Sequence, residues 1–111
     1  MKETLRECIE DCLNCHGICL NTVTYCLAQG GRHGEAEHIR LLLDCAEICQ
    51  TSANFMLRGS LQHTRTCAVC AEICAQCAHD CQQLQDDAHM KNCAEACRRC
   101  AESCRQMATH A

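Results

Sequence analysis

The segment that decides the fold reads Cys93-Ala94-Glu95-Ala96-Cys97-Arg98-Arg99-Cys100-Ala101-Glu102-Ser103-Cys104. Its four cysteines follow one another at intervals of four, three and four residues. Because an α-helix has 3.6 residues per turn, side chains at these intervals lie on one face. The charged residues between them, such as Glu95 and Arg98, suit the opposite, solvated face. The segment is therefore predicted to be a helix with one row of inward-facing thiols.

The same spacing returns along the rest of the chain. It is complete in two further runs, Cys8, Cys12, Cys15, Cys19 and Cys70, Cys74, Cys77, Cys81. A third segment keeps the register with two cysteines, as Cys45, Cys49, Ser52, Met56. Cys26 extends the first run across Thr22, and Cys67 extends the run at Cys70 backwards. Helix bundles normally place Leu and Ile in such rows, so the repeat predicts a bundle whose core is made of cysteine.

Glycine and aspartate mark the breaks between the helices. Proline, which would interrupt a helix, does not occur. The breaks are Gly30-Gly31 with Gly34, Gly59-Ser60, and Gln85-Asp86-Asp87, where aspartate can cap the next helix. The predicted helices cover residues 3–29, 35–58, 61–85 and 87–108. Connections this short favour antiparallel neighbours. The prediction is an all-α, antiparallel up-down four-helix bundle with a cysteine-lined core, in a single domain spanning residues 1–111.

Composition and charge exclude several function classes. The net charge is −4, and the chain has one Phe, one Tyr and no Trp, so the basic, aromatic surface of a nucleic-acid-binding protein is missing. No run reaches the roughly 18 apolar residues of a membrane span. Residues 1–8 are charged and lack the apolar core of a signal peptide. We therefore expect a cytoplasmic protein, in which thiols stay reduced and cysteine clusters bind metal.

The cysteine rows favour Cu(I) as the bound metal. Cu(I) prefers soft thiolate and accepts few ligands. One Cu⁺ for each thiolate leaves a neutral core, whereas one Zn²⁺ for four thiolates leaves a charge of −2, which is costly to bury. The sequence therefore predicts storage of multiple Cu(I) ions, without enzymatic activity. The predicted ligands are Cys8, Cys12, Cys15, Cys19, Cys26, Cys45, Cys49, Cys67, Cys70, Cys74, Cys77, Cys81, Cys93, Cys97, Cys100 and Cys104, together with His38 and Met90.

His38 and Met90 are predicted as ligands because they continue the rows. His38 lies seven residues before Cys45, and Met90 lies three before Cys93. In an antiparallel bundle both lie at the end that also holds Cys26, where they act in copper uptake or, alternatively, as capping or surface side chains. Leu42 and Leu84 occupy row positions near that end and are expected to narrow it. Weaker candidates gather at the other end: Met56, His63, Met107 and His110.

Three alternatives to copper storage remain open at this point. A general zinc or thiol buffer would use the same thiols. An iron–sulfur electron carrier is suggested by the C-x-x-C fragments, although ferredoxin runs have a different spacing and end in proline. Structural disulfides are typical of secreted, loop-rich domains and do not suit long helices.

Two apolar stripes lie beside the cysteine rows. One is in the first helix, at Ile9, Leu13, Leu20, Val23 and Leu27, and the other in the second, at Ile39, Leu43, Ala46, Ala53 and Leu57. They either pack inside the monomer or form an interface between copies, since long apolar stripes are seldom left exposed.

The repeated C-x-x-x-C-x-x-C-x-x-x-C resembles the bacterial copper storage proteins, in the branch without a leader. Cys8–Cys12, Cys45–Cys49, Cys67–Cys74 and Cys93–Cys104 carry the resemblance, which spans nearly the whole chain. It implies a four-helix bundle that assembles as a homotetramer and stores many Cu(I) ions. A copper donor or acceptor protein is a further candidate partner. Some members have Cys where this chain has Thr22, His38 and Met90. The resemblance therefore predicts neither the copper capacity of this chain nor the ligands at the end that holds His38 and Met90.

Overall fold

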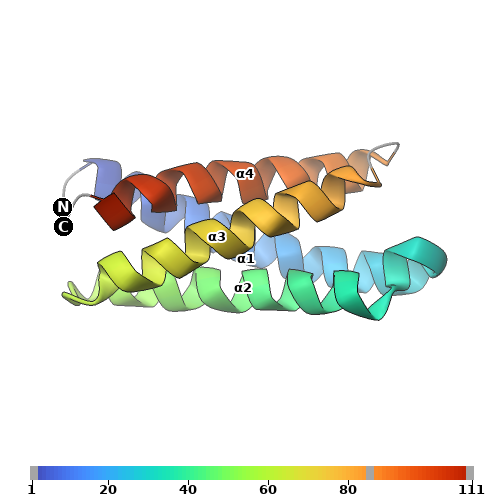
Figure 1. Ribbon diagram of the computed structural model, residues 1–111, viewed down its shortest axis with the longest axis horizontal. Coiled ribbons are helices and arrows are strands. Elements are labelled where there is room, and N and C mark those ends of the chain that lie inside the picture. The colour runs from blue at the N-terminus through green and yellow to red at the C-terminus, as the bar shows by residue number, and fades with distance from the viewer. Residues whose placement is uncertain (1–2, 85–86, 110–111) are drawn as a thin grey trace.

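A computed structural model describes residues 3–84 and 87–109. In this part of the chain four α-helices are joined by short connections, with one 3₁₀ helix between the first two (Figure 1). Their bounds are α1 Glu3–Gln29, η1 Gly31–Gly34, α2 Ala36–Leu57, α3 His63–Gln82 and α4 Ala88–Thr109. The predicted all-α four-helix bundle is confirmed.

The helices run antiparallel and form an elongated body of 42 × 19 × 17 Å. Helix α1 packs against α2 and α4, and α3 packs against the same two helices. The end at which η1 joins α1 to α2, called the η1 end below, also holds the end of α3 and the start of α4 (Figure 1). None of the helices in the described ranges has the length and apolar character needed to cross a membrane.

The helix boundaries lie close to the predicted ones, with the largest difference in α3. This helix was expected over 61–85 and covers His63–Gln82. It ends early because the N–H groups of Gln83 and Leu84 bond the carbonyls of Asp80 and Cys81, three residues back, in a tighter turn. Gly30 and Gly59 follow α1 and α2 with φ angles of 68° and 67°, which glycine adopts readily.

Sulfur takes the place of the usual aliphatic core. All sixteen cysteines are buried, with at most 1% of any residue exposed. Small residues beside the rows, among them Ala46, Ala53, Ala94 and Ala101, are buried too and let the helices approach closely. Two hydroxyls interrupt the rows and are satisfied locally: Thr22 Oγ1 donates to the Ile18 carbonyl at 2.7 Å, and Ser52 Oγ donates to Cys67 Sγ at 3.7 Å.

The two apolar stripes divide between the core and the surface. Ile9, Ala46 and Ala53 are buried. Five leucines on the outer faces of α1 and α2 remain 41–58% exposed: Leu13, Leu20, Leu27, Leu43 and Leu57. Packing inside the monomer therefore covers only part of each stripe.

Candidate metal centre

A continuous network of thiols runs along the bundle axis. Eleven sulfur atoms are linked to one another by contacts of 3.5–4.0 Å. They belong to Cys8, Cys12, Cys15, Cys19, Cys45, Cys49, Cys70, Cys74, Cys97, Cys100 and Cys104. Every helix contributes, so the predicted rows meet in the core as one array.

Most of the short sulfur contacts join different helices. Along a single helix, Cys15 and Cys19 approach to 3.9 Å and Cys70 and Cys74 to 3.7 Å. Between helices, the distance is 3.5 Å both for Cys12 with Cys104 and for Cys45 with Cys74. With a metal–thiolate bond of about 2.3 Å, sulfurs about 4.0 Å apart surround an ion with three ligands. The array therefore suits soft ions shared between helices, in addition to pairs on one helix.

The remaining thiols extend the array towards both ends. Cys81 donates to Cys93 at 3.8 Å near the η1 end, and Cys77 is buried beside them on α3. At the opposite end, Cys67 lies with Cys8 and Cys104 in a group whose sulfurs are all within 4.8 Å of one another. All sixteen thiols are free, so the disulfide alternative has no support here.

The thiols form a buried core linked by hydrogen bonds between sulfur atoms. Hydrogen bonding with Cys100, at 3.7 Å, together with burial raises the pKa of the Cys49 thiol above its ordinary value. Hydrogen bonding with Cys15, whose sulfur is 3.7 Å away, likewise raises the pKa of the Cys97 thiol. A bound ion must therefore displace protons, and its charge must replace theirs.

Cys26, His38 and Met90 meet at the η1 end, as the row positions predict. The Cys26 sulfur is 3.4 Å from Nε2 of His38 and donates to the Met90 thioether sulfur at 3.6 Å. All three side chains are buried. Burial raises the pKa of the Cys26 thiol to about 11. Leu42, one helical turn after His38 on α2, is fully buried, and the narrowing of this end stays a prediction.

Asp80 supports this group and was not predicted. Its Oδ2 accepts a hydrogen bond of 2.5 Å from Nδ1 of His38. The two residues line a cavity of about 90 Å³, along with Arg32, Glu35, Glu37, Gln83 and Leu84. The cavity thus lies between charged surface groups and the buried His38 imidazole, which faces Cys26.

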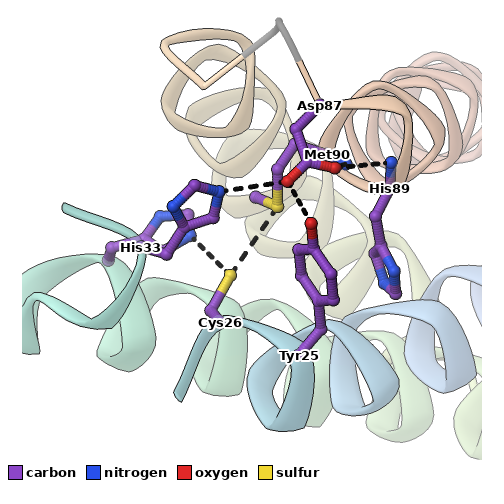
Figure 2. Close-up of polar contacts among 7 residues, drawn as sticks. Tyr25, Cys26, His33, Asp87, His89 and Met90 are labelled. Atoms are coloured by element: carbon purple, nitrogen blue, oxygen red, sulfur yellow. Dashed lines mark hydrogen bonds and ion pairs between the residues drawn. The ribbon is translucent and has the colours of Figure 1, made fainter. Parts of the chain in front are cut away.

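A second polar cluster fastens the chain across the η1 end (Figure 2). Asp87 accepts hydrogen bonds from the Tyr25 hydroxyl and, at 3.2 Å, from Nε2 of His33. Its other oxygen accepts from the backbone N–H groups of His89 and Met90, so Asp87 is the N-cap of α4. The Tyr25 ring stacks on His89 with centroids 4.1 Å apart. The Tyr25 hydroxyl, followed by these backbone N–H groups, lowers the pKa of Asp87.

Sequence reasoning found only part of this cluster. The cap was predicted within Gln85-Asp86-Asp87, and Asp87 provides it, while Gln85 and Asp86 lie outside the described residues. His33, which bonds Asp87, was not predicted as part of it. One indication in the sequence that Tyr25 has a specific role is that it is the only tyrosine in the chain.

The opposite end is built from methionine. Cys67 donates to the Met56 thioether at 3.7 Å, and Met107 is buried. His63 is held by its own turn instead, with Nδ1 2.8 Å from the Ser60 carbonyl oxygen. His110 lies outside the described residues. Sulfur therefore extends to this end, whereas imidazole reaches the array at the η1 end.

The chain is similar to proteins of known family and structure. Residues 1–109 match the sequence profile of the family described as Csp, copper storage protein. The Nmul_A1745 protein from Nitrosospira multiformis is 49% identical, with a TM-score of 0.91 over 97% of each chain. The Cu(I)-bound copper storage protein BsCsp3 is 37% identical, with a TM-score of 0.89 over 96% of this chain and 100% of that one. A cytosolic copper storage protein from Streptomyces lividans, solved during copper loading with five coppers, is 28% identical, with a TM-score of 0.85 over 98% and 95%.

Proposed function

The chain belongs to the copper storage protein family, and we propose that it holds Cu(I) on all sixteen of its cysteines, with His38 and Met90 as further ligands at the η1 end. The protein stores Cu(I) in its cysteine-rich core, and many ions bind to each chain. The proposal assigns the ligands and the order in which ions reach them.

One observation carries the assignment, namely the continuity of the sulfur network. Eleven thiols are linked by contacts of 3.5–4.0 Å. An ion bound between two neighbouring thiols of this network therefore has a third sulfur nearby. Cu(I) accepts two or three thiolate ligands that it shares with its neighbours. One Cu⁺ for each thiolate also cancels the charge that proton loss creates in a buried core. The array thus suits many shared Cu(I) ions.

The η1 end is the proposed site of uptake. The cavity at Asp80 and His38 borders charged surface residues, and His38 Nε2 faces the Cys26 sulfur. Imidazole and thioether are neutral ligands that copper can leave without a proton being taken up. A Cu(I) ion would therefore bind Cys26, His38 and Met90 first. It would then pass by ligand exchange to the thiolates at Cys81 and Cys93.

We infer that the chain acts as a store in the cytoplasm and not as an enzyme. A catalytic thiol has to be accessible and have a lowered pKa, whereas every thiol of this chain is buried. The Streptomyces lividans relative is described as cytosolic, which supports the same location for this chain. Residues 1–111 are proposed to work as one storage domain, with a copper donor or acceptor protein as a transient partner.

The exposed leucines of α1 and α2 support assembly into a homotetramer. Leu13, Leu20 and Leu27 are spaced by seven residues on α1, and Leu43 and Leu57 lie on the adjacent α2. A row of half-exposed leucines on two packed helices is a surface that association would bury. We propose this face as the contact between copies.

An iron–sulfur cluster fits this core less well than separate ions do. The closest groups of thiols have all their sulfur atoms within 4.8 Å of one another. Thiolates that ligate a cluster surround several iron and sulfide atoms, which require more space than such a group encloses. The spacing therefore favours single ions and shared copper.

The test is an anaerobic titration of the reduced chain with Cu(I), read against a competing chelator and by metal analysis. We expect tight uptake that approaches or passes one ion for each of the sixteen cysteines. Saturation at four ions or fewer would contradict the proposal. A Cys26→Ser, His38→Ala double variant tests the order of filling. The rate of Cu(I) transfer from a chelator should fall, while the same titration should show that most of the capacity remains.

A further inference from the structure

Four thiols inside the bundle already lie around one point in space. They are Cys15 and Cys19 of α1, Cys45 of α2 and Cys97 of α4. Cys15 lies 3.9, 3.8 and 3.7 Å from Cys19, Cys45 and Cys97, respectively. Cys97 lies 3.7 Å from Cys19 and 4.0 Å from Cys45. All four sulfurs are within 4.8 Å of one another.

These distances match the edges of a tetrahedron around zinc. A Zn–S bond of about 2.3 Å places the four sulfurs of a tetrahedral site about 3.8 Å apart. Five of the six sulfur pairs lie at 3.7–4.0 Å before any ion is bound. A single tetrahedral ion could therefore bind without moving the helices.

Two more groups have four thiols within the same limit. One contains Cys12, Cys70, Cys100 and Cys104, and the other contains Cys15, Cys49, Cys74 and Cys100. The last group lies between the other two and shares Cys15 with one and Cys100 with the other. An ion with four unshared thiolates can thus occupy both outer groups at once. It cannot occupy the middle group at the same time.

The middle thiols can donate hydrogen bonds to two such sites. A zinc ion with four thiolates keeps a charge of −2, which needs hydrogen-bond donors when it is buried. Cys74 lies 3.5 Å from Cys45, and Cys49 lies 3.7 Å from Cys100. The Cys74 and Cys49 thiols can therefore each donate an S–H hydrogen bond to a thiolate of an outer group.

We propose that the copper-free chain is also a zinc-binding protein, with two separate tetrahedral Zn(II) sites. One is Cys15, Cys19, Cys45 and Cys97, and the other is Cys12, Cys70, Cys100 and Cys104. The inference goes beyond copper storage and does not depend on the proposed copper ligands at the η1 end. Because thiolate binds Cu(I) more strongly and shared copper leaves a neutral core, copper displaces the zinc.

The experiment titrates the reduced, copper-free chain anaerobically with Zn(II), and in parallel with Co(II) as a coloured substitute. We expect two equivalents of each metal. Cobalt should show the intense visible bands of a tetrahedral ion together with sulfur-to-metal charge transfer in the near ultraviolet. The weak spectrum of six-coordinate cobalt would overturn the proposal, and so would three or more tight equivalents.

Single substitutions identify the two sites. Cys97→Ser and Cys19→Ser each break only the first group, and Cys70→Ser breaks only the second, so each should reduce the count from two equivalents to one. Cys74→Ser alters only the middle group and keeps a hydrogen-bond donor, so two equivalents should remain. Circular dichroism verifies the helices of every variant. Two tight equivalents in both Cys97→Ser and Cys19→Ser would overturn the assignment, whatever the copper titration gives.

Discussion

Asp80 fixes the orientation of His38. Its Oδ2 is 2.5 Å from Nδ1 of the ring, and the other ring nitrogen, Nε2, is 3.4 Å from the Cys26 sulfur. The hydrogen bond to a carboxylate places the ring proton on Nδ1 and leaves the lone pair of Nε2 directed at Cys26. The buried imidazole is thus prepared to bind an ion on the side that faces the thiol array.

Asp80→Ala should slow copper uptake without lowering the final capacity. Loss of a carboxylate behind a ligating histidine typically costs 10–100-fold in metal affinity or activity. Because Asp80 is 38% exposed, we expect the lower end, about tenfold. Stopped-flow transfer of Cu(I) from a chelator measures the rate, and metal analysis measures the capacity. Glu72→Ala removes the same charge from an exposed position of α3 and is the matched control. An equal change in both variants would show that general charge is responsible.

The sequence predicted the rows because helical periodicity is a local property. Cys93, Cys97, Cys100 and Cys104 had to share one face whatever the rest of the chain did. Which thiols meet across helices could not be predicted in this way. The contact of Cys12 with Cys104 joins residues 92 positions apart and depends on how far each helix slides along its neighbours, which the connections and the core packing set together.

The contacts of the supporting residues at the η1 end could not be predicted from the sequence, for a related reason. Asp80 immediately precedes Cys81, so it lies off the cysteine row, and no spacing rule connects it with His38. Asp87 was predictable as a helix cap, but its bond to Tyr25 spans 62 positions. Helix η1, which brings His33 to Asp87, has too few residues to show any periodicity.

Replacing Cys70 and Cys74 together by Ser should lower the copper capacity and leave the helices intact. The two sulfurs are 3.7 Å apart, and both contact Cys49. Serine is similar in shape but is a poor ligand for Cu(I). We expect a loss of at least two ions per chain by metal analysis, with unchanged circular dichroism. Val69→Ser, at a half-exposed position of the same helix, should bind as much copper as the parent chain. An unchanged capacity in the double variant would contradict the row arrangement.

Met90→Leu tests the thioether as a ligand while preserving the packing. The side chain is fully buried, and leucine has a similar volume, so the loss of stability should stay below about 1.5 kcal/mol. Leucine offers no ligand atom, so the first Cu(I) to bind should transfer more slowly or bind more weakly. Competition with a chelator at less than one equivalent of copper measures this. Met107→Leu at the opposite end is the control and should leave the binding of this first ion unchanged.

Leu20→Glu should break the proposed contact between copies. Leu20 lies between Leu13 and Leu27 in the exposed row of α1, where association would have to bury the new charge without a partner. Native mass spectrometry should show tetramers for the parent chain and smaller species for the variant. Val69→Glu introduces the same charge on α3 and should remain tetrameric. A monomeric parent chain would show that the exposed leucines serve another purpose.

Asp87→Ala should destabilise the copper-free fold in a manner that depends on pH. Asp87 caps α4 and accepts the Tyr25 hydroxyl, and these contacts lower the pKa of its carboxyl below the ordinary 3.8. A group with a lowered folded-state pKa stabilises the fold above its unfolded-state pKa and loses that contribution as the pH falls through the folded value. At pH 7 the variant should be less stable by about 1 kcal/mol, the usual loss for an N-cap. As the pH falls below 3.8 and then through the lowered folded-state pKa, the difference should shrink towards zero.

Denaturant unfolding of the reduced chain, followed by circular dichroism at several pH values, measures this dependence. Tyr25→Phe is the companion variant, because it removes one hydrogen bond to Asp87 and leaves the cap in place. Its loss at pH 7 should be smaller than that of Asp87→Ala, and it too should decline in acid, because a protonated carboxyl is a weaker acceptor. A difference between Asp87→Ala and the parent chain that stays constant from pH 7 to pH 3 would show that the ionised carboxylate does not stabilise this end of the bundle.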